Sequence, residues 1–352
     1  MRAIVYHGRG DVRIEDVDEP TPGAGEVKIK VETNGICGTD LHEYYDGPIF
    51  ISTAPHPLTG AQMPQILGHE FSGTVVGVGA GVSDVREGDR VCVEPIYRCD
   101  ECPRCRAGFY NLCQKIAFHG LMSHGGGLSE YTVVPARTVH HLPDSVSLQL
   151  GALVEPMSVG YHAARRGELS DGESAIVLGA GPIGIGTYLA LRGLGISDVT
   201  VIEPSAVRRE SIQKLGATSV IDPLDTDPVA YVRDHTDGVG AAAVYETAGV
   251  DASFGSAVDM VAARRRIVEV AICDHALPLN TNTLVFTEAM VVGSLAYTGE
   301  DFAAVLDLMS RGHYVTDGWV EHIGLDEIVD EGFAALRAQR KMKVLVDVGA
   351  GR

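Results

Sequence analysis

Four cysteines gather in residues 98–113, RCDECPRCRAGFYNLC, with the spacing C-x2-C-x2-C-x7-C. Four thiolates complete the tetrahedral coordination of a structural zinc and leave no open position for a substrate. A bacterial iron–sulfur run begins similarly, but its fourth cysteine follows after three residues and precedes a proline. A redox C-x-x-C pair is a third interpretation, although two overlapping copies would be unusual. The spacing favours structural zinc, held by Cys99, Cys102, Cys105 and Cys113, so the chemistry must lie elsewhere.

Three other stretches offer side chains of the kinds that bind metals. NGICGTDLH supplies Cys37, Thr39, Asp40 and His42, and LGHEF supplies His69 and Glu70. ALVEPMSVG adds Glu155 near a change in composition. Catalytic zinc uses mixed cysteine, histidine and carboxylate ligands and keeps one position open. Taken singly, each residue has an ordinary structural interpretation, because a lone cysteine is usually a small buried apolar group.

SAIVLGAGPIGIG predicts a dinucleotide-binding turn, because G-x-G-x-x-G follows an apolar strand and precedes a helix. The glycines permit a tight turn, close approach of the pyrophosphate, and helix packing against the strand. The candidate contacts are Gly179, Gly181, Pro182, Ile183 and Gly184. Glu203 ends the next strand, where a carboxylate accepts hydrogen bonds from the ribose and repels a 2′-phosphate, which favours NAD. Arg208 and Arg209 follow closely, and an arginine there can accommodate the 2′-phosphate of NADP.

The elements that must position these residues change in kind along the 352-residue chain. Residues 1 to about 150 favour β-structure, because Val27, Ile29 and Val31 alternate with polar neighbours. From residue 174 onward strands and helices alternate, which predicts a parallel sheet with helices on both faces. Helices over 299–312 and 328–340 and a strand over 343–348 end the chain.

The charge balance excludes some partners and compartments. A net charge of −19 disfavours binding to nucleic acid, because a strongly acidic chain repels phosphate backbones. Neither a membrane span nor a signal peptide is apparent, so we expect a cytoplasmic protein without a membrane partner. In a reducing compartment a disulfide framework is improbable, and Cys92 and Cys273 are expected to be buried thiols.

In combination, CGTDLH, GHE, the four-cysteine loop and GAGPIG resemble the zinc-containing medium-chain dehydrogenase/reductase family, over essentially the whole chain. The segment between Asp46 and Pro64 resembles the branch that contains butanediol and sorbitol dehydrogenases. The resemblance implies a GroES-like β-barrel catalytic domain formed by residues 1–153 and 296–352. A Rossmann NAD-binding domain, residues 154–295, is inserted into it. The fold class is therefore α/β plus β.

The resemblance also assigns roles to individual residues. Two zinc ions per chain are implied, one structural and one catalytic, the latter held by Cys37, His69 and Glu70. Glu155 is a fourth ligand or a water-linked neighbour, and Asp40 orients the histidine ligand. Thr39 and His42 match the proton-relay positions. Lys343 matches a basic residue near the pyrophosphate, although Lys341 lies close by. His119 and His124 are treated as ordinary polar loop residues.

The implied activity is zinc-dependent hydride transfer between NAD(H) and a secondary alcohol or ketone. The implied small-molecule substrates are 2,3-butanediol, acetoin or diacetyl, and a vicinal diol suits the site because its second oxygen could lie near the zinc or Glu155. A polyol dehydrogenase of the sorbitol or xylitol type is the first alternative. A zinc-free reductase and a non-catalytic zinc module are the others. VFTEAMVVGSLAYTG lies where the family pairs Rossmann domains, so a homodimer or homotetramer is expected.

Overall fold

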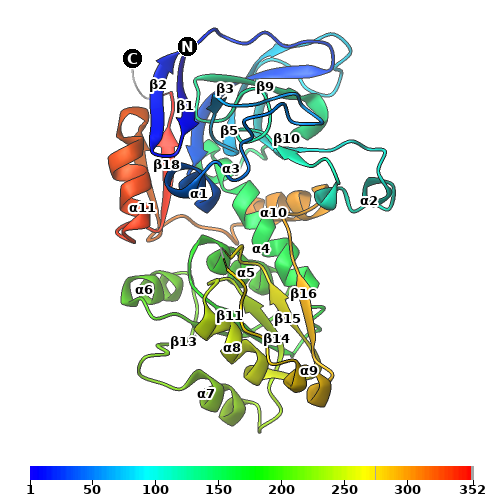
Figure 1. Ribbon diagram of the computed structural model, residues 1–352, viewed down its shortest axis with the longest axis vertical. Helices are drawn as coiled ribbons and strands as arrows, with labels where there is room; N and C mark the ends of the chain where they lie inside the picture. The colour runs from blue at the N-terminus through cyan, green and yellow to red at the C-terminus, as the bar shows by residue number, and fades with distance from the viewer. Residues whose placement is uncertain (274, 350–352) are drawn as a thin grey trace. The chain divides into compact units, whose positions relative to one another are not determined.

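A computed structural model of the protein describes residues 1–273 and 275–349. The chain divides into two compact units, drawn in Figure 1. Unit 1 contains residues 1–155, 298–310 and the segment from 319 onward, and unit 2 contains 156–297 and 311–318. The breaks at 155 and 297 lie two residues from the sequence-based boundaries at 153 and 295. Residues 311–318 group with unit 2, although the sequence-based division assigns them to the catalytic domain.

Unit 1 is built mainly of antiparallel strands. Its largest sheet has the order β10-β6-β5-β3-β18-β17, and β9 also pairs with β3. These strands are β3 (Glu26–Gly35), β5 (Glu70–Val78), β6 (Arg90–Val93), β9 (Tyr131–Pro135), β10 (Val139–His141), β17 (Val320–Gly324) and β18 (Lys343–Asp347). A three-stranded sheet contains β1 (Arg2–Gly8), β2 (Asp11–Asp16) and β4 (Gln65–Ile66), and β7 (Ile96–Tyr97) pairs with β8 (Ala117–Phe118).

The core of unit 1 follows the alternation in its strands. Val27, Ile29 and Val31 of β3 are fully buried, as the period of two predicts. The helical segments of unit 1 are α1 (Gly38–Asp46), α2 (Pro103–Arg106), η1 (Tyr110–Leu112), η2 (Ala136–Thr138), α3 (Leu148–Ala152), α10 (Gly299–Ser310), η3 (Leu325–Glu327), η4 (Ile328–Ala334) and α11 (Ala335–Arg337). The helix expected over 328–340 is thus a π-helical turn, η4, that continues into α11.

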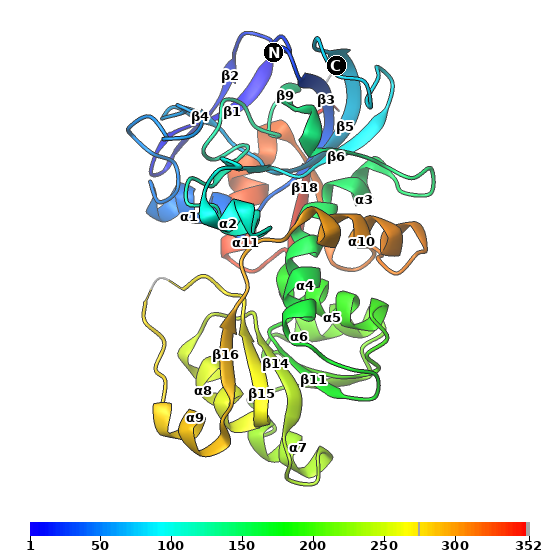
Figure 2. The same ribbon diagram turned by 90° about the vertical axis from the view of Figure 1, so that its right-hand side faces the viewer.

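Unit 2 is a six-stranded parallel sheet with the order β13-β12-β11-β14-β15-β16. Its strands are β11 (Ser174–Leu178), β12 (Asp198–Ile202), β13 (Ser219–Ile221), β14 (Ala241–Glu246), β15 (Val261–Glu269) and β16 (Met290–Gly293). The helices that follow these strands are α5 (Pro182–Gly193), α6 (Ala206–Lys214), α7 (Pro228–His235), α8 (Asp251–Met260) and α9 (Thr281–Thr287), and α4 (Val154–Arg166) leads into the unit (Figure 2). Numbered within the unit, the strand order is 3-2-1-4-5-6, which is the doubly wound Rossmann arrangement. The predicted fold class is confirmed.

Candidate active site

Three side chains of metal-binding type meet inside unit 1. One ligand atom each from Cys37, His69 and Glu70 lies within 4.8 Å of the others. Cys37 is the N-cap of α1, Glu70 is the first residue of β5, and His69 immediately precedes it. Gly35 of β3 pairs with Glu70, which brings the end of β3, and Cys37 just beyond it, beside the GHE motif. The antiparallel register therefore joins two sequence motifs that lie about thirty residues apart.

Asp40 lies behind the histidine of this group. Its Oδ2 accepts a hydrogen bond from the Cys37 N–H at 2.9 Å, and its Oδ1 lies 3.8 Å from His69 Nδ1. Both groups are buried. Burial alone would lower the pKa of His69, but the charges of Asp40 and Cys37 outweigh it and raise this pKa to about 10. The 3.8 Å separation exceeds hydrogen-bond distance, so Asp40 acts on His69 through its charge.

Glu155 is buried near the start of α4, with 6% of its surface exposed. Among the described residues, the group whose ligand atoms all lie within 4.8 Å of one another contains Cys37, His69 and Glu70 but not Glu155. Its negative charge nevertheless helps to raise the pKa of His69. Glu155 is therefore a neighbour of the group and not a fourth member of the tight cluster.

Lys343, which is expected to lie near the pyrophosphate, forms a buried ion pair within unit 1. It is 2% exposed, and its ammonium group donates to the Glu70 carboxylate and, at 2.9 Å, to the carbonyl oxygen of Ile36. Strand β18 pairs with β3 on the side opposite β5, and this pairing brings Lys343 to Glu70 across β3. The partner of Lys343 within unit 1 is thus the acidic member of the metal-type group, and its role near the pyrophosphate stays a prediction. Lys341 pairs with Glu331 at 2.9 Å.

Gly35 leaves the space that the Glu70–Lys343 pair fills. A Cβ atom at Gly35 would lie 2.1 Å from Glu70 Oε2 and 3.2 Å from Lys343 Cε. No side-chain carbon fits at such a distance from a carboxylate oxygen. The lack of a side chain at Gly35 is therefore a condition for the buried ion pair.

The two expected relay residues lie on α1. Thr39 Oγ1 is 3.7 Å from Cys37 Sγ, and Thr39 is partly exposed. His42 comes three residues later, one turn along the same helix, and is exposed. The helix therefore connects the metal-type group to an imidazole that reaches solvent.

Glu43, next to His42, was not identified from the sequence. It is fully buried, and its carboxylate accepts hydrogen bonds from the backbone N–H groups of residues 49, 50 and 51. It thereby fixes the start of the loop that runs to Pro64, the stretch that carries the branch-specific resemblance. The N–H groups that it binds lie only six to eight residues further along the chain.

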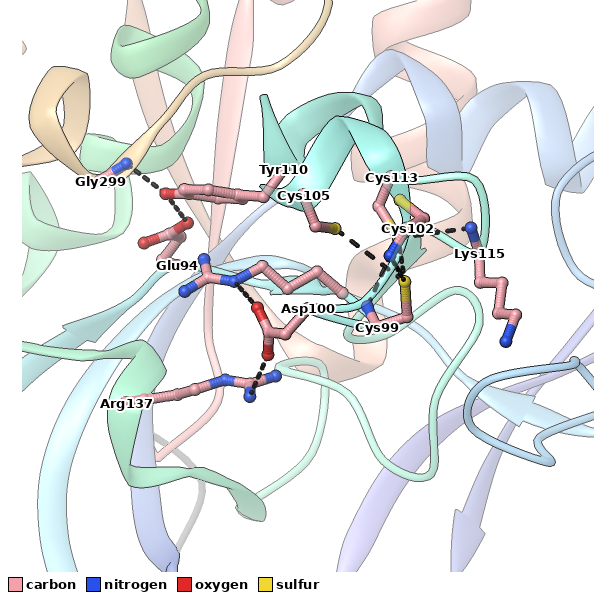
Figure 3. Close-up of polar contacts among 11 residues, drawn as sticks. Glu94, Cys99, Asp100, Cys102, Cys105, Tyr110, Cys113, Lys115, Arg137 and Gly299 are labelled. Carbon is pink, nitrogen blue, oxygen red and sulfur yellow. Dashed lines mark hydrogen bonds and ion pairs between the residues drawn. The ribbon is translucent and has the colours of Figure 1, made fainter. Parts of the chain in front are cut away.

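The four cysteines of the loop after β7 form a second group (Figure 3). The Sγ atoms of Cys99 and Cys113 are 3.5 Å apart, and those of Cys99 and Cys105 are 4.0 Å apart. All four cysteines are free thiols and none forms a disulfide. Backbone N–H groups of Gln114 and Cys105 lower the pKa of Cys102 to about 6, which favours the thiolate that binds metal. The group fits a closed four-sulfur zinc site.

Tyr110 connects this loop to other parts of unit 1 (Figure 3). Its hydroxyl donates to Glu94 Oε1 at 2.7 Å and accepts a hydrogen bond from the backbone N–H of Gly299. The guanidinium of Arg98 lies 3.8 Å above its ring. These contacts fix the cysteine loop to the start of α10 and to the end of β6 without contributing a metal ligand.

In unit 2 the glycine turn has the conformation that its spacing predicts. Gly179 adopts a φ of +97°, which disfavours side chains. A Cβ at Gly184 would meet the carbonyl oxygen of Gly179 at 2.0 Å, whereas at Gly181 it would meet open space. Gly181 is the N-cap of α5, and Pro182 and Ile183 form its first turn, where backbone N–H groups favour a phosphate.

Glu203 lies beside this turn and is 2% exposed. One carboxylate oxygen accepts the Ala180 N–H at 2.7 Å, and the other accepts the Ser205 N–H at 2.9 Å. Arg208 lies 3.8 Å from the same carboxylate, and Arg209 pairs with Asp222 at 2.7 Å. The turn therefore presents a carboxylate that is already fixed by backbone donors, with one arginine close by.

The two remaining cysteines and two histidines differ in how well their burial matches the expectation from the sequence. Cys92 is buried as expected, and burial raises its pKa. Cys273 is only partly buried, so the expectation of a buried thiol is wrong there. His119 is not an ordinary loop residue. It is fully buried, its Nε2 lies 2.7 Å from Thr132 Oγ1, and burial lowers its pKa to about 3, so it is a neutral structural residue. His124 is exposed.

Among the described residues, none of the helices combines the length and the apolar character needed to cross a membrane.

Comparison with known proteins supports both units. The family description "Alcohol dehydrogenase GroES-like domain" matches residues 23–144, and "Zinc-binding dehydrogenase" matches residues 182–311. A (R,R)-butanediol dehydrogenase of Bacillus subtilis is 41% identical over 98% of this chain and 99% of its own. That of Neisseria gonorrhoeae is 38% identical over 99% of both chains. A crystal structure of 2R,3R-butanediol dehydrogenase from Bacillus subtilis, 40% identical, superposes with a TM-score of 0.92 over 98% of this chain and 99% of its own.

More distant relatives broaden the substrate and cofactor range. A sorbitol dehydrogenase of Bacillus subtilis is 32% identical over 98% of this chain and 97% of its own. The structure of an Escherichia coli alcohol dehydrogenase with NADH is 27% identical and has a TM-score of 0.86 over 99% of both chains. That of a Sinorhizobium meliloti dehydrogenase with NADP is 29% identical and has a TM-score of 0.87 over 98% of both chains. The matching family is a zinc-binding one, and both of these structures hold a nicotinamide cofactor. The chain belongs to the zinc-containing medium-chain dehydrogenase/reductase family and is an alcohol dehydrogenase.

Proposed function

We propose that this enzyme uses NAD to oxidise one carbinol of a vicinal diol, 2,3-butanediol, and reduces acetoin or diacetyl in the reverse direction. The observation that carries the proposal is the convergence of Cys37, His69 and Glu70 in a chain 41% identical to a butanediol dehydrogenase over 98% of its length. Function resides in the site and not in the fold, so the metal-type group and the nearby loop carry more weight than the architecture.

Two zinc ions per chain are part of the proposal. Cys37, His69 and Glu70 would hold the catalytic ion, with Glu155 as a direct or water-linked neighbour, and the four cysteines would hold the structural one. The buried Nδ1 of His69 has no hydrogen-bond partner among the described residues and faces Asp40, which fits a histidine that binds metal through its other nitrogen. When bound, zinc supplies Lewis acidity toward the substrate oxygen, and the nicotinamide accepts or gives the hydride.

The protein side chains would handle the proton. Thr39 Oγ1, 3.7 Å from Cys37 Sγ, would take the hydroxyl proton of the substrate and at the same time pass on its own proton toward His42. His42 lies one turn further along α1 and is exposed, so it can release that proton to solvent. Imidazole suits this task because it changes its charge in the working pH range. Asp40 would hold His69 in its orientation, and Glu43 would fix the loop after α1.

NAD is the proposed cofactor in preference to NADP. The Glu203 carboxylate stands at the end of β12 beside the glycine turn, where it would accept hydrogen bonds from the ribose and repel a 2′-phosphate. Arg208 lies 3.8 Å from that carboxylate, so its charge is directed toward Glu203.

A homo-oligomer is also proposed. Strand β16 ends the parallel sheet, and the adjoining residues expose apolar side chains, with Val285 at 72%, Phe286 at 86% and Met290 at 40% exposure. An apolar sheet edge is a template for pairing with a second copy.

A polyol dehydrogenase is the second candidate, favoured by the 32% identity to a sorbitol dehydrogenase. The experiment measures NAD reduction with each stereoisomer of 2,3-butanediol beside sorbitol and xylitol. Fast turnover of isomers with an R carbinol and little turnover of polyols would support the diol. A preference for polyols would leave the zinc site and mechanism in place but overturn the substrate.

A further inference from the structure

Two carboxyl groups stand side by side at the carboxyl edge of the parallel sheet in unit 2. Glu246 is the last residue of β14 and Glu269 is the last residue of β15, and the register of the two strands pairs them directly. Side chains at paired positions of neighbouring strands point to the same face. Two acids so placed repel each other when both are ionised.

Glu246 has all the hydrogen-bond donors that a carboxylate needs. It is fully buried, and its oxygens accept hydrogen bonds from the N–H groups of Ala248 and Gly249 at 3.1 and 2.9 Å and from Ser253 Oγ at 2.5 Å. Donors of this kind stabilise the charged form. Glu246 is therefore the member of the pair whose surroundings suit a carboxylate.

Glu269 lacks such donors. Both its carboxyl oxygens are inaccessible to solvent and accept no hydrogen bond from the described residues. Burial and the charge of Glu246 raise the pKa of Glu269 to about 8. It therefore holds a proton at neutral pH, and its O–H can point toward Glu246.

Charged side chains on the neighbouring elements α8, β15 and β16 do not offset the repulsion between Glu246 and Glu269. On α8, Asp251 pairs with His275 at 2.9 Å, and Asp259 adds a further acid. The arginines of β15 are paired with other carboxylates: Arg264 with Glu288, Arg265 with Glu173 and Arg266 with Glu168. On the other side, β16 contributes no titratable side chain, and Ser294 follows it.

The pair lies next to the cofactor turn. Thr247 follows Glu246, and its hydroxyl donates at 2.7 Å to the carbonyl oxygen of Leu178, the residue before Gly179. In the register of β15 and β16, Glu269 is opposite Gly293. A Cβ atom added at Gly293 would have no neighbouring atom within 4 Å. In doubly wound sheets the second set of strands faces the second mononucleotide of the cofactor, which here is the nicotinamide half. The oxidised nicotinamide ring is a cation and the reduced ring is neutral.

We propose that Glu269 is a buried acid of the cofactor site in unit 2 whose protonation responds to the oxidation state of the nicotinamide. It is ionised beside the oxidised, positively charged ring and protonated beside the reduced ring, and its proton leaves to solvent when NAD⁺ binds. The inference rests on the proposed function only in requiring that unit 2 bind nicotinamide dinucleotides. It makes the choice between NAD⁺ and NADH depend on pH through a group in unit 2, independently of the metal-type site in unit 1.

The test compares dissociation constants for NAD⁺ and NADH by calorimetry from pH 6.5 to 9, without substrate. In the wild type the ratio Kd(NAD⁺)/Kd(NADH) should fall by about tenfold across this range, because ionisation of Glu269 favours the cation. Glu269→Gln should remove most of that change while it leaves the NADH affinity at pH 6.5 within about twofold, since both side chains are then neutral. Glu269→Asp keeps an acid and should keep the pH dependence. Glu288→Gln removes an exposed carboxylate, 72% accessible, from the same unit and should match the wild type.

An unchanged pH profile in Glu269→Gln, with normal NADH binding, would overturn this inference and leave the proposed function standing. A failure of the wild type to bind either dinucleotide would instead contradict the proposed function. If Glu269→Gln does not fold, the inference is tested in the wild type and in Glu269→Asp by measuring the protons released when each cofactor binds. Binding of NAD⁺ near pH 7.5 should release more protons than binding of NADH, and equal release by both cofactors would overturn the inference.

Discussion

Replacing Lys343 by methionine tests whether this lysine supports the metal-type site. The side chains of Lys343 and Glu70 are 3% and 1% exposed, and the ammonium also donates to the Ile36 carbonyl. Lys343→Met keeps the apolar stem but leaves the Glu70 carboxylate buried without its cation. Breaking a buried pair in this way costs about 3–5 kcal/mol, because the remaining charge is uncompensated.

The assay is thermal unfolding of the zinc-loaded protein. For a unit of roughly 200 residues, a loss of about 3 kcal/mol lowers the melting temperature by roughly 6–12 °C. Lys341→Met is a matched control, because Lys341 lies two residues away and pairs with Glu331, whose side chain is 43% exposed. Exposed pairs contribute about 0–1 kcal/mol, so this control should lose at most a few degrees. In protein freed of the catalytic metal, the double variant Lys343→Met with Glu70→Gln should regain part of the stability, since residue 70 then carries no unpaired charge.

Equal melting temperatures for Lys343→Met and Lys341→Met would refute this reasoning. Weaker NADH binding by Lys343→Met than by Lys341→Met would support the predicted role of Lys343 near the pyrophosphate, beside its ion pair with Glu70.

Three further predictions follow from individual contacts. Gly35→Ala should lower both the melting temperature and the zinc content, because its Cβ would lie 2.1 Å from Glu70 Oε2, whereas Gly255→Ala, with open space around its Cβ, should be neutral or slightly stabilising in the same assays. Cys102→Ser should reduce the bound zinc, measured by elemental analysis, from two ions per chain to one; two retained ions would contradict the four-sulfur site. Glu269 holds its proton more tightly in the folded protein, with a pKa of about 8 against a usual 4.5, so wild-type stability should fall as pH rises through that window. The melting temperature of Glu269→Gln relative to the wild type should therefore increase from about pH 4.5 to 8 and stay level above; a constant difference would exclude the raised pKa.

Local spacing was enough to predict much of this protein. The alternation in β3, the glycine turn and the four-cysteine loop each follow from short-range rules, and the predicted fold class and family are confirmed. In these segments the residues that interact lie close together in sequence.

Long-range pairings account for what the sequence did not reveal. Lys343 and Glu70 meet because β18 and β5 flank β3, and no local pattern indicates that strand order. The neighbouring acids Glu246 and Glu269 depend in the same way on the parallel register of β14 and β15. His119 was misassigned because its hydrogen-bond partner Thr132 lies 13 residues away in the chain, in β9.

The most direct test of the proposed zinc chemistry measures diol-dependent NADH formation and zinc content in the same preparation of Cys37→Ser. Cys37 is one of the three clustered ligands and lies outside the four-cysteine loop. The variant should keep about one zinc per chain and bind NADH, but lose roughly a thousandfold or more in rate, because Lewis-acid stabilisation contributes several kcal/mol and each 1.36 kcal/mol changes the rate about tenfold. A rate within a few-fold of the wild type, with only the four-cysteine zinc present, would contradict a catalytic zinc at Cys37, His69 and Glu70.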